Sequence, residues 1–509
     1  MKVNGLLIRS AIIAALGGLL FGFDTAVISG AEKALRGLFD LSDAYYGFTV
    51  TSALIGTIIG SITFSRPSDR FGRKKTLLIT AVLYTVSALG SALAWNWYSF
   101  IIFRFIGGIG VGGATVVSPT YIAEISPARL RGRLVAVTQF NIVFGILLAF
   151  LSNYVITILF KDMGQGIVEG NAWRWMFGVE AVPALVFFFL LFGNPESPRW
   201  LVSRHRDNEA GDILAALGNQ AVDVELRSIT DSLATEHNTL TEPFYCRKYS
   251  KPIFYAVLIA MFNQLSGINA ILYYAPSIFE MAGAGEESAM LRSVVIGFTN
   301  LVFTMAAMAI IDHFGRRRLM LVGSVGYILS LGAAAWAFQA YQTEFQGVTE
   351  ASQAVAVART QFHEAAQAAG EEIDTQALAA ALAPLTAKSD AAVANAGRGG
   401  VVVMISLLVF IASHAFGQGA VIWVFLSEIF PNRVRARGQA LGSFTHWFMA
   451  AGVSWAFKPI IEGLGAPGPC IAFSIFAGMM VLQLLWVIFI MPETKGIPLE
   501  QIQKELGID

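Results

Sequence analysis

Two ionisable residues stand alone inside long apolar stretches of the sequence. Asp24 is the one charge in FGFDTAVISG, residues 21–30, and Arg104 is the one charge deep in FRFIGGIGVG. A charged carboxylate at the centre of a membrane helix costs about 2.5–3.5 kcal/mol, so such a group is paired, protonated or functional. An Asp whose separation from an Arg changes can take up a proton on one side of a membrane and release it on the other. Asp24 is therefore a candidate proton carrier and Arg104 its modulator; a permanent structural ion pair is the alternative.

A second group of polar side chains falls in the apolar stretch NQLSGINAILYYAPSIF. It supplies Asn263, Gln264 and Asn269, and Gly267 interrupts it. Amides inside a membrane helix need hydrogen-bond partners, because lipid offers none. These amides can serve either a polar ligand or contacts between helices, and the spacing does not choose between the two.

Membrane helices must position both groups. Hydrophobic residues make up 55% of the 509 residues and charged residues only 14%, with a mean hydropathy of +0.61, whereas a soluble domain is about 25% charged. A spanning helix needs about 20 mostly apolar residues. The sequence predicts an all-α integral membrane protein with twelve spans, at residues 8–31, 45–65, 75–95, 98–121, 134–159, 174–193, 252–275, 292–312, 318–341, 400–426, 438–461 and 469–491.

Short loops rich in Lys and Arg predict the orientation. They follow spans 2, 4, 8 and 10 and read RPSDRFGRKK, ARLRGR, GRRR and NRVRAR. Positive loops stay on the cytoplasmic side, so both termini and the loop after span 6 are expected there. We expect a multi-pass plasma-membrane protein, in a bacterium one of the inner membrane.

The loop sequences also repeat. DRFGRK at 69–74 returns as DHFGRR at 312–317, EISPARLR at 124–131 returns as EIFPNRVR at 428–435, and PES at 195 returns as PET at 492. Each pair follows corresponding spans, which predicts two six-helix halves. The expected segments are an N-terminal half at 1–193, cytoplasmic linker helices at 194–251, a C-terminal half at 252–491 and a cytoplasmic tail at 492–509.

The second half carries an insertion at residues 342–398. It is rich in Ala, Gln and acidic residues and cannot bury much of a core. We expect a helical or mobile excursion on the exterior side, of unknown role. In the linker, DNEAGDILAAL and DVELRSITDSLATE have helical apolar spacing and acidic first turns, which predicts amphipathic helices.

Six motifs in order resemble the sugar porters of the major facilitator superfamily, which include bacterial xylose/proton symporters and glucose facilitators. In chain order they are GGLLFGFDTAVISGA, the basic loop motif DRFGRK, PESPRWL, NQLSGINAILYYAPSIF, WVFLSEIFPNRVRARGQA and PETKG. The resemblance covers nearly the whole chain except 342–398. It implies the major facilitator fold and a proton-coupled hexose or pentose symporter that works by alternating access. Asp24 strengthens this prediction, since proton-coupled members carry Asp at that position and passive facilitators commonly carry Asn.

The resemblance also implies a sugar site. Amide and indole groups suit a sugar, whose hydroxyls need hydrogen bonds and whose ring needs an apolar face. Two positions depart from the commoner residues of the family, His446 and Gln418, and they leave the preferred sugar open. The implied substrate-binding residues are Gln139, Asn263, Gln264, Asn269, Asn300, Gln418, Trp423, His446 and Trp447.

Charged residues of the repeated loops are candidates for conformational gating. Parallel halves can rock about a central site, and charge clusters that pair across them when the inner mouth is closed would bias the two states. Anchoring by the positive-inside preference alone is the alternative. The candidates are Asp69, Arg70, Arg73, Glu124 and Arg131 in the first half, and Asp312, Arg316, Glu428 and Arg435 in the second.

Other classes of function fit poorly. The sequence has no HExxH, GxSxG or P-loop motif, and its six histidines lack ligand spacing, so neither an enzyme nor a metal or other cofactor is expected. A net charge of zero gives no sign of a nucleic-acid partner. The expected partners are a sugar, protons and the lipid bilayer, with a functional monomer. The remaining alternatives are a facilitative uniporter, a polyol symporter and a sugar sensor that does not transport.

Overall fold

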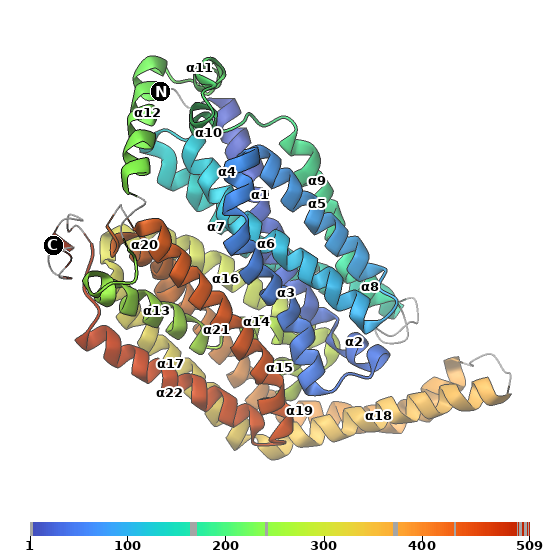
Figure 1. The fold of residues 1–509 in the computed structure, drawn as a ribbon. Helices are drawn as coiled ribbons and strands as arrows, with labels where there is room; N and C mark the ends of the chain where they lie inside the picture. Colours follow the sequence, from blue (N-terminus) through green and yellow to red (C-terminus); the bar gives the residue numbers. More distant parts are fainter. Residues whose placement is uncertain are drawn as a thin grey trace.

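The structure, a computed structural model, describes residues 4–162, 171–239, 243–369, 375–431, 434–495, 497, 501–502, 506 and 508. Over these residues the chain is helical and contains no strand. Figure 1 shows two bundles, one built from the blue to teal-green helices and one from the light-green to red helices. The predicted all-α architecture is confirmed.

The first bundle holds the first six predicted spans. Its elements are α1 (Gly5–Val27), the 3-10 turn η1 (Ile28–Gly30), α2 (Glu32–Phe39), α3 (Asp43–Thr63), α4 (Ser65–Phe71), α5 (Arg73–Ala92), α6 (Trp97–Ile125), α7 (Ala128–Asp162), α8 (Ala172–Gly178) and α9 (Ala181–Leu191). The main contacts join α1 to α7 and α6 to both α3 and α5.

Three helices and a turn follow as the linker, α10 (Pro198–Ser203), α11 (Asp207–Ala216), α12 (Val222–Thr239) and the 3-10 turn η2 (Arg247–Tyr249). Ser197 caps α10 by accepting a hydrogen bond from the Trp200 amide, and Pro198 occupies the first helical position. Buried residues of α10 and α11 form a small apolar core of their own with α12 packed against it. The two amphipathic linker helices predicted from the sequence are present as α11 and α12.

The second bundle repeats the architecture. Its elements are α13 (Ser250–Leu265), α14 (Ile268–Tyr273), α15 (Ala275–Met281), α16 (Glu286–Phe314), α17 (Arg316–Ala340), α18 (Gln342–Ala369), α19 (Thr375–His414), the π-helical turn η3 (Ala415–Gly419), α20 (Ala420–Glu428), α21 (Arg435–Gly463) and α22 (Gly468–Phe489). Contacts of α17 with α22 and α19, and of α13 with α21, hold it together.

Glycines bring α3 and α6 into close contact. A Cβ added to Gly108 would lie 1.9 Å from the Ala53 carbonyl oxygen, and one added to Gly56 would lie 2.2 Å from the Phe105 carbonyl oxygen. The two helices therefore touch through their backbones, as small residues four apart allow in membranes.

The seventh predicted span is broken at Gly267. This residue has φ +84°, and a Cβ there would lie 2.5 Å from the Phe476 ring, so both backbone and space require glycine. The break ends α13 directly after Gln264 and restarts the helix before Asn269.

Eleven described segments are long and apolar enough to cross a membrane. The eleventh predicted span, 438–461, is α21, which is 29 residues long but is not among these segments. Charged residues such as Lys458 and Glu462 lower its apolar character. It packs lengthwise against α3 and α13, like its neighbours, so it completes the second six-helix bundle.

The insertion folds as a pair of long helices. Helix α18 and the first part of α19 pack against each other, and Phe345, Val348 and Ala396 join the main apolar core near α15. Helix α19 then continues without interruption into the tenth span. Figure 1 shows α18 projecting from the bundle at the end opposite to both chain termini. The predicted excursion is thus helical, and residues 370–374 lie outside the described part.

The two bundles are joined mainly at one end. We call the end that carries the α4–α5, α6–α7, α16–α17 and α20–α21 loops the basic end. The largest apolar core includes η1 and α2 of the first bundle with α14 and α15 of the second, at the opposite end. The two apolar cores nearer the basic end are each confined to one bundle and its linker segment. Across the bundles, α3 contacts α21 and α7 contacts α16.

Candidate functional site

Asp24 and Arg104 form a buried ion pair between α1 and α6. Arg104 Nη1 donates to Asp24 Oδ1, and Nη2 donates to the Asp24 carbonyl oxygen at 3.2 Å. The guanidinium also lies 5.5 Å from the centre of the Phe177 ring. Asp24 is 4% and Arg104 1% exposed, so the pair is shielded from water. The predicted partnership is confirmed as a contact.

A second carboxyl beside this pair was not singled out from the sequence. Glu180, between α8 and α9, is 2% exposed, and its charge interacts with those of Asp24 and Arg104. The signal was available, since Glu180 is the only charge in MFGVEAVPALVFF, just as Asp24 is in its own stretch. Three ionisable groups therefore share one apolar interior. The carboxyl that is protonated decides which of the two carboxylates remains to neutralise the positive charge of Arg104.

The amides of α13 lie in a hydrogen-bonded cluster. Gln264 Nε2 donates to Asn263 Oδ1 at 3.1 Å and lies 3.1 Å from His446 Nε2 on α21. Asn263 Nδ2 donates to Gln418 Oε1 on η3 at 3.5 Å. The cluster thus joins three helical elements that are distant in sequence.

Aromatic rings adjoin this cluster. The His446 ring lies 4.8 Å from that of Trp447 and 5.3 Å from that of Trp423. Trp447 also meets Phe21 of α1 edge-on at 5.5 Å, which links the second bundle to the helix of Asp24. Phe21 was not predicted as a site residue, because one more Phe in an apolar helix carries no signal. The structure brings together the predicted residues Asn263, Gln264, Gln418, Trp423, His446 and Trp447.

Three predicted residues lie outside the hydrogen-bonded cluster in the described part of the chain. Asn300 on α16 is buried and accepts a hydrogen bond from Thr304 of its own helix at 3.4 Å. Gln139 on α7 and Asn269 on α14 are half-buried. Their part in a common site stays a prediction.

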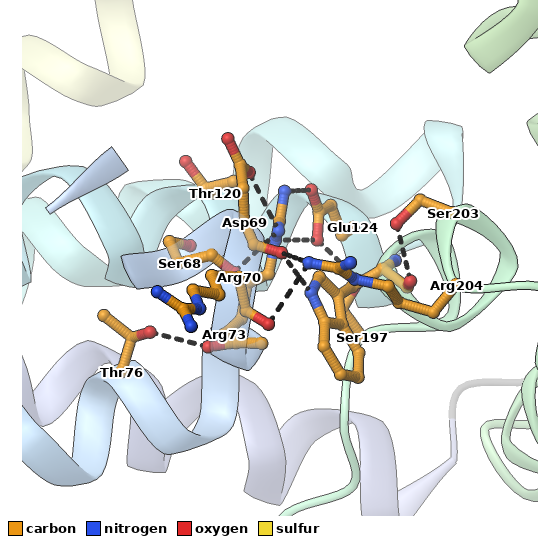
Figure 2. Close-up of polar contacts among 12 residues, drawn as sticks. Ser68, Asp69, Arg70, Arg73, Thr76, Thr120, Glu124, Ser197, Ser203 and Arg204 are labelled. Atoms are coloured by element: carbon orange, nitrogen blue, oxygen red, sulfur yellow. Dashed lines mark hydrogen bonds and ion pairs between the residues drawn. The ribbon is translucent and has the colours of Figure 1, made fainter. Parts of the chain in front are cut away.

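The first set of repeated charges forms a network at the basic end (Figure 2). Arg73 holds Glu124 through two hydrogen bonds, Nε to Oε2 at 2.8 Å and Nη2 to Oε1 at 3.0 Å, and Ser197 Oγ donates to the same carboxylate. Asp69 lies 3.2 Å from Arg73 Nη1, and its carbonyl oxygen accepts from Arg204. This network fastens the linker to α4, α5 and α6.

Two of the predicted gating residues in this region have smaller roles. Arg70 lies with its guanidinium 5.3 Å from the Phe71 ring, and Arg131 donates from Nε to the Ala123 carbonyl oxygen at 3.1 Å. Both side chains are exposed.

Glu196 caps the start of α5. Its Oε1 accepts from the Arg73 amide at 2.9 Å and from the Lys74 amide at 3.1 Å, where a helix N-terminus favours a negative charge. Burial raises the pKa of Glu196 above its ordinary value, although the amide hydrogen bonds act in the opposite direction.

The second set repeats the central contacts of the first. Arg316 Nη2 donates to Glu428 at 2.8 Å, Thr494 donates to the same carboxylate, and Glu493 accepts from the Arg316 amide at 3.0 Å. Arg435 Nε donates to the Phe430 carbonyl oxygen at 3.3 Å. The predicted residue Asp312 has a side chain outside the described part. The internal repeat read from the sequence is therefore matched in three dimensions.

Both networks pair within their own bundle in this structure. The ion pairs described between bundles lie at the opposite end, where Lys458 pairs with Glu32, Arg36 with Glu462 at 2.8 Å, and Lys161 with Glu287 at 2.6 Å. Lys33 adds two more, with Glu280 at 2.7 Å and with Glu286 at 3.9 Å. Pairing of the repeated charges across the bundles, expected when the inner mouth is closed, is not tested by this arrangement.

No group of three or more His, Cys, Asp or Glu side chains gathers as metal ligands among the described residues. The two cysteines, Cys246 and Cys470, are free thiols.

Comparison with known proteins gives consistent matches over the whole chain. The sequence profile described as sugar (and other) transporter matches residues 10–370 and 375–506. The chain is 33% identical to a glucose transport protein of Synechocystis sp., over 96% of this chain and 95% of the relative. It is 34% identical to the D-xylose-proton symporter of Escherichia coli K12, over 97% and 94%. Its fold is similar to the inward-open structure of the xylose transporter XylE from E. coli, with a TM-score of 0.76, 31% identity and coverage of 98% and 99%.

Proposed function

The chain belongs to the sugar (and other) transporter family, and from this membership we propose that it is a proton-coupled sugar symporter that works by alternating access. One observation carries the proton coupling: the Asp24–Arg104 pair, 4% and 1% exposed, on a helix whose Phe21 contacts the aromatic edge of the amide cluster. It places a titratable group next to the elements that must move around a substrate.

The coupling follows from charge balance. With Asp24 ionised, Arg104 neutralises it and holds α1 to α6. A proton on Asp24 removes this attraction, and the charge of Arg104 is then neutralised by the neighbouring carboxyl of Glu180. The two states of protonation therefore favour different arrangements of α1, α6 and the α8–α9 junction, which is the condition for a proton to shift a conformational equilibrium.

The proposed substrate is a hexose or pentose. Amides and indoles side by side can meet both the hydroxyls and the apolar face of a sugar ring. The relatives named for glucose and D-xylose support this class. The proposed substrate-binding residues are Gln139, Asn263, Gln264, Asn269, Asn300, Gln418, Trp423, His446 and Trp447.

The proposed orientation puts the basic end in the cytoplasm, with both termini and the linker helices. The end where the bundles are joined then faces outward, so this structure corresponds to a state closed to the exterior. The repeated networks around Arg73 and Arg316 are proposed to gate the cytoplasmic mouth. We propose a functional monomer in a plasma membrane, in a bacterium the inner membrane.

Transport by purified protein in proteoliposomes tests the proposal. Labelled D-glucose, D-xylose, D-arabinose and inositol are offered with and without an inward proton gradient. The wild type is expected to accumulate at least one sugar above equilibrium only with the gradient. Asp24→Asn is expected to lose accumulation and to keep sugar exchange, because the substituted residue cannot take up the proton.

Asp40→Asn is the matched control, since it makes the same chemical change at an exposed position between α2 and α3. It is expected to accumulate sugar like the wild type. Accumulation that persists in Asp24→Asn would refute the carrier role of Asp24. Sugar movement that ignores the gradient in the wild type would instead make the protein a facilitative uniporter.

A further inference from the structure

We infer that Gln483 and Ser324, which lie behind the amide cluster on α22 and α17, are positioning residues that fix which atoms of the cluster face the substrate. The inference rests on the proposed sugar site. Neither residue has to contact the sugar. Both act by fixing the orientation of the Gln418 side-chain amide. Both are fully buried, at 0% exposure.

A single chain of hydrogen bonds connects them to the site. Gln418 Nε2 donates to Gln483 Oε1 at 2.7 Å, and Gln483 Nε2 donates to Ser324 Oγ at 2.8 Å. Ser324 Oγ in turn donates to the carbonyl oxygen of Met320 at 2.7 Å. At its other end the chain reaches Asn263, whose Nδ2 donates to Gln418 Oε1 at 3.5 Å.

The direction of this chain is set at Met320. Two oxygen atoms 2.7 Å apart must share a hydrogen, and a carbonyl oxygen has none, so the Ser324 hydroxyl gives it. Ser324 Oγ can then only accept from Gln483, which must turn its NH₂ group towards Ser324. Its carbonyl oxygen consequently faces Gln418.

The same reasoning passes along the chain into the site. Gln418 must offer NH₂ to Gln483, so its carbonyl oxygen faces Asn263. Asn263 offers NH₂ to Gln418, and its own carbonyl oxygen accepts from Gln264 Nε2 at 3.1 Å. Because the NH₂ group of Gln264 faces Asn263 and His446, its side-chain carbonyl oxygen points away from both residues and remains available to accept a hydrogen bond.

This oxygen is unsatisfied. Gln264 is 1% exposed, and its Oε1 is a buried acceptor with no hydrogen-bond partner among the described residues. A buried acceptor without a partner costs about 1–3 kcal/mol, so a ligand that supplies a donor is favoured there. The site therefore presents an acceptor to one sugar hydroxyl, which must act as the donor.

If the direction of these hydrogen bonds were reversed, the site would present a donor to the substrate in place of an acceptor. If Gln418 turned over, Asn263 and Gln264 would follow, and Gln264 would offer N–H where it now offers oxygen. Among the described residues, the hydrogen bonds of Ser324 and Gln483 oppose this reversal from behind. Their role is thus in selectivity between donor and acceptor groups of the substrate rather than in contact with it.

Binding of fluorinated sugars tests the inference, because fluorine in place of a hydroxyl cannot donate. Affinities of wild type, Gln483→Met and Ser324→Ala are measured for D-glucose and D-xylose and for their analogues with one hydroxyl replaced by fluorine. In the wild type, one position is expected to lose roughly 5- to 10-fold in affinity on fluorination, the effect of one hydrogen bond. In both variants this loss is expected to shrink to less than about twofold at the same position.

Ser330→Ala is the matched control. Ser330 is also buried on α17 and also donates to a helix carbonyl, that of Tyr327 at 3.2 Å, but it takes no part in the series of hydrogen bonds from Met320 to Gln264. The Ser330→Ala variant is expected to lose affinity on fluorination at the same position and by the same factor as the wild type. A merely structural role of Gln483 and Ser324 would weaken all analogues equally and leave the pattern unchanged, which would overturn the inference. Failure of the wild type to bind any of the sugars offered in the transport assay would overturn the proposed function itself.

Discussion

Arg104 is the residue on which the interior of the first bundle depends most. Its guanidinium serves the Asp24 carboxylate, the Asp24 carbonyl oxygen and the face of Phe177 at once, with 1% exposure. A buried ion pair adds little net stability, but removal of one partner leaves an uncompensated charge. Arg104 is therefore required chiefly because Asp24 is there.

Replacement of Arg104 by Met should show this dependence. Arg104→Met is expected to lower the free energy of unfolding by about 3–5 kcal/mol, because Asp24 loses its partner. The double variant Asp24→Asn with Arg104→Met should recover part of that loss, since position 24 no longer carries a charge, while the buried Glu180 lacks Arg104 in both variants. Thermal unfolding of the purified variants in one detergent measures both effects. Equal destabilisation in the single and the double variant would contradict the interpretation.

Residues at the site differ in how far sequence reveals them. Asp24 and Arg104 could be paired in advance because each is the only charge in an apolar stretch. Gln483 has the same setting in FSIFAGMMVLQLLW, yet one amide can be satisfied by any neighbouring helix. Its partners Gln418 and Ser324 lie far away in the chain, so only the packing of α17, α22 and η3 reveals the connection.

At the scale of elements, close backbone contact decides how α3 and α6 pack. Gly108→Ala is expected to destabilise the protein by about 1–3 kcal/mol, because the new Cβ would lie 1.9 Å from the Ala53 carbonyl oxygen and the helices must separate. Gly478→Ala on α22 is the control, since a Cβ there meets nothing within 4 Å. It should be neutral or slightly stabilising. Thermal unfolding of the two variants side by side tests the contrast.

Lys33 on helix α2 predicts that the stability of this region depends on pH. Burial lowers the pKa of Lys33, but its ion pairs with Glu280 and Glu286 outweigh this and raise the pKa above the ordinary 10.5. The stabilisation from Lys33 is thus fully present below pH 10.5 and is lost as the pH rises through the raised pKa. Above that pH, loss of these half-exposed ion pairs should lower the free energy of unfolding by no more than about 1 kcal/mol, which thermal unfolding across this pH range would register. Lys33→Arg should remove this response, because Arg stays charged.

The sequence predicted the elements better than their ends. Every predicted span coincides with a helical segment, although α21 is less apolar than the other eleven, and the positive φ at Gly267 agrees with the predicted break. The insertion was left open between helix and mobile chain because its Ala-rich composition suits a helix but offers little core. Its contact with α15 through Phe345 and Val348, which secures the hairpin, depends on tertiary structure.

At the scale of the whole molecule, ion pairs hold the two bundles together at the end away from the basic loops. Lys458 of α21 is 2% exposed and contacts Glu32 of α2, together with Ser277 at 2.9 Å and Glu462 at 2.5 Å. In a transporter with two bundles, such a contact stabilises one state and must break in the other.

Replacement of Lys458 should shift that balance. Lys458→Met is expected to disfavour the state seen here by about 2–4 kcal/mol, because buried Glu32 loses its nearer cation and keeps Arg36 at 3.8 Å. Spin labels at the exposed positions Leu38 and Leu464, on the two sides of this contact, should move apart in the population average. Lys161→Met is the control, since its pair with Glu287 is largely exposed and should contribute under about 1 kcal/mol. An unchanged distance in Lys458→Met would show that apolar packing alone keeps this end closed.

The uninterrupted course of α19 has a practical consequence for imaging. This helix has 40 residues, about 60 Å at 1.5 Å per residue, and runs from the excursion straight into the second bundle. A protein of 54.9 kDa embedded almost wholly in detergent offers particle images few landmarks for alignment. The rod formed by α18 and α19 protrudes from one bundle only, so it breaks the pseudo-twofold symmetry. It provides a natural fiducial that distinguishes the two lobes in electron micrographs without a bound antibody fragment.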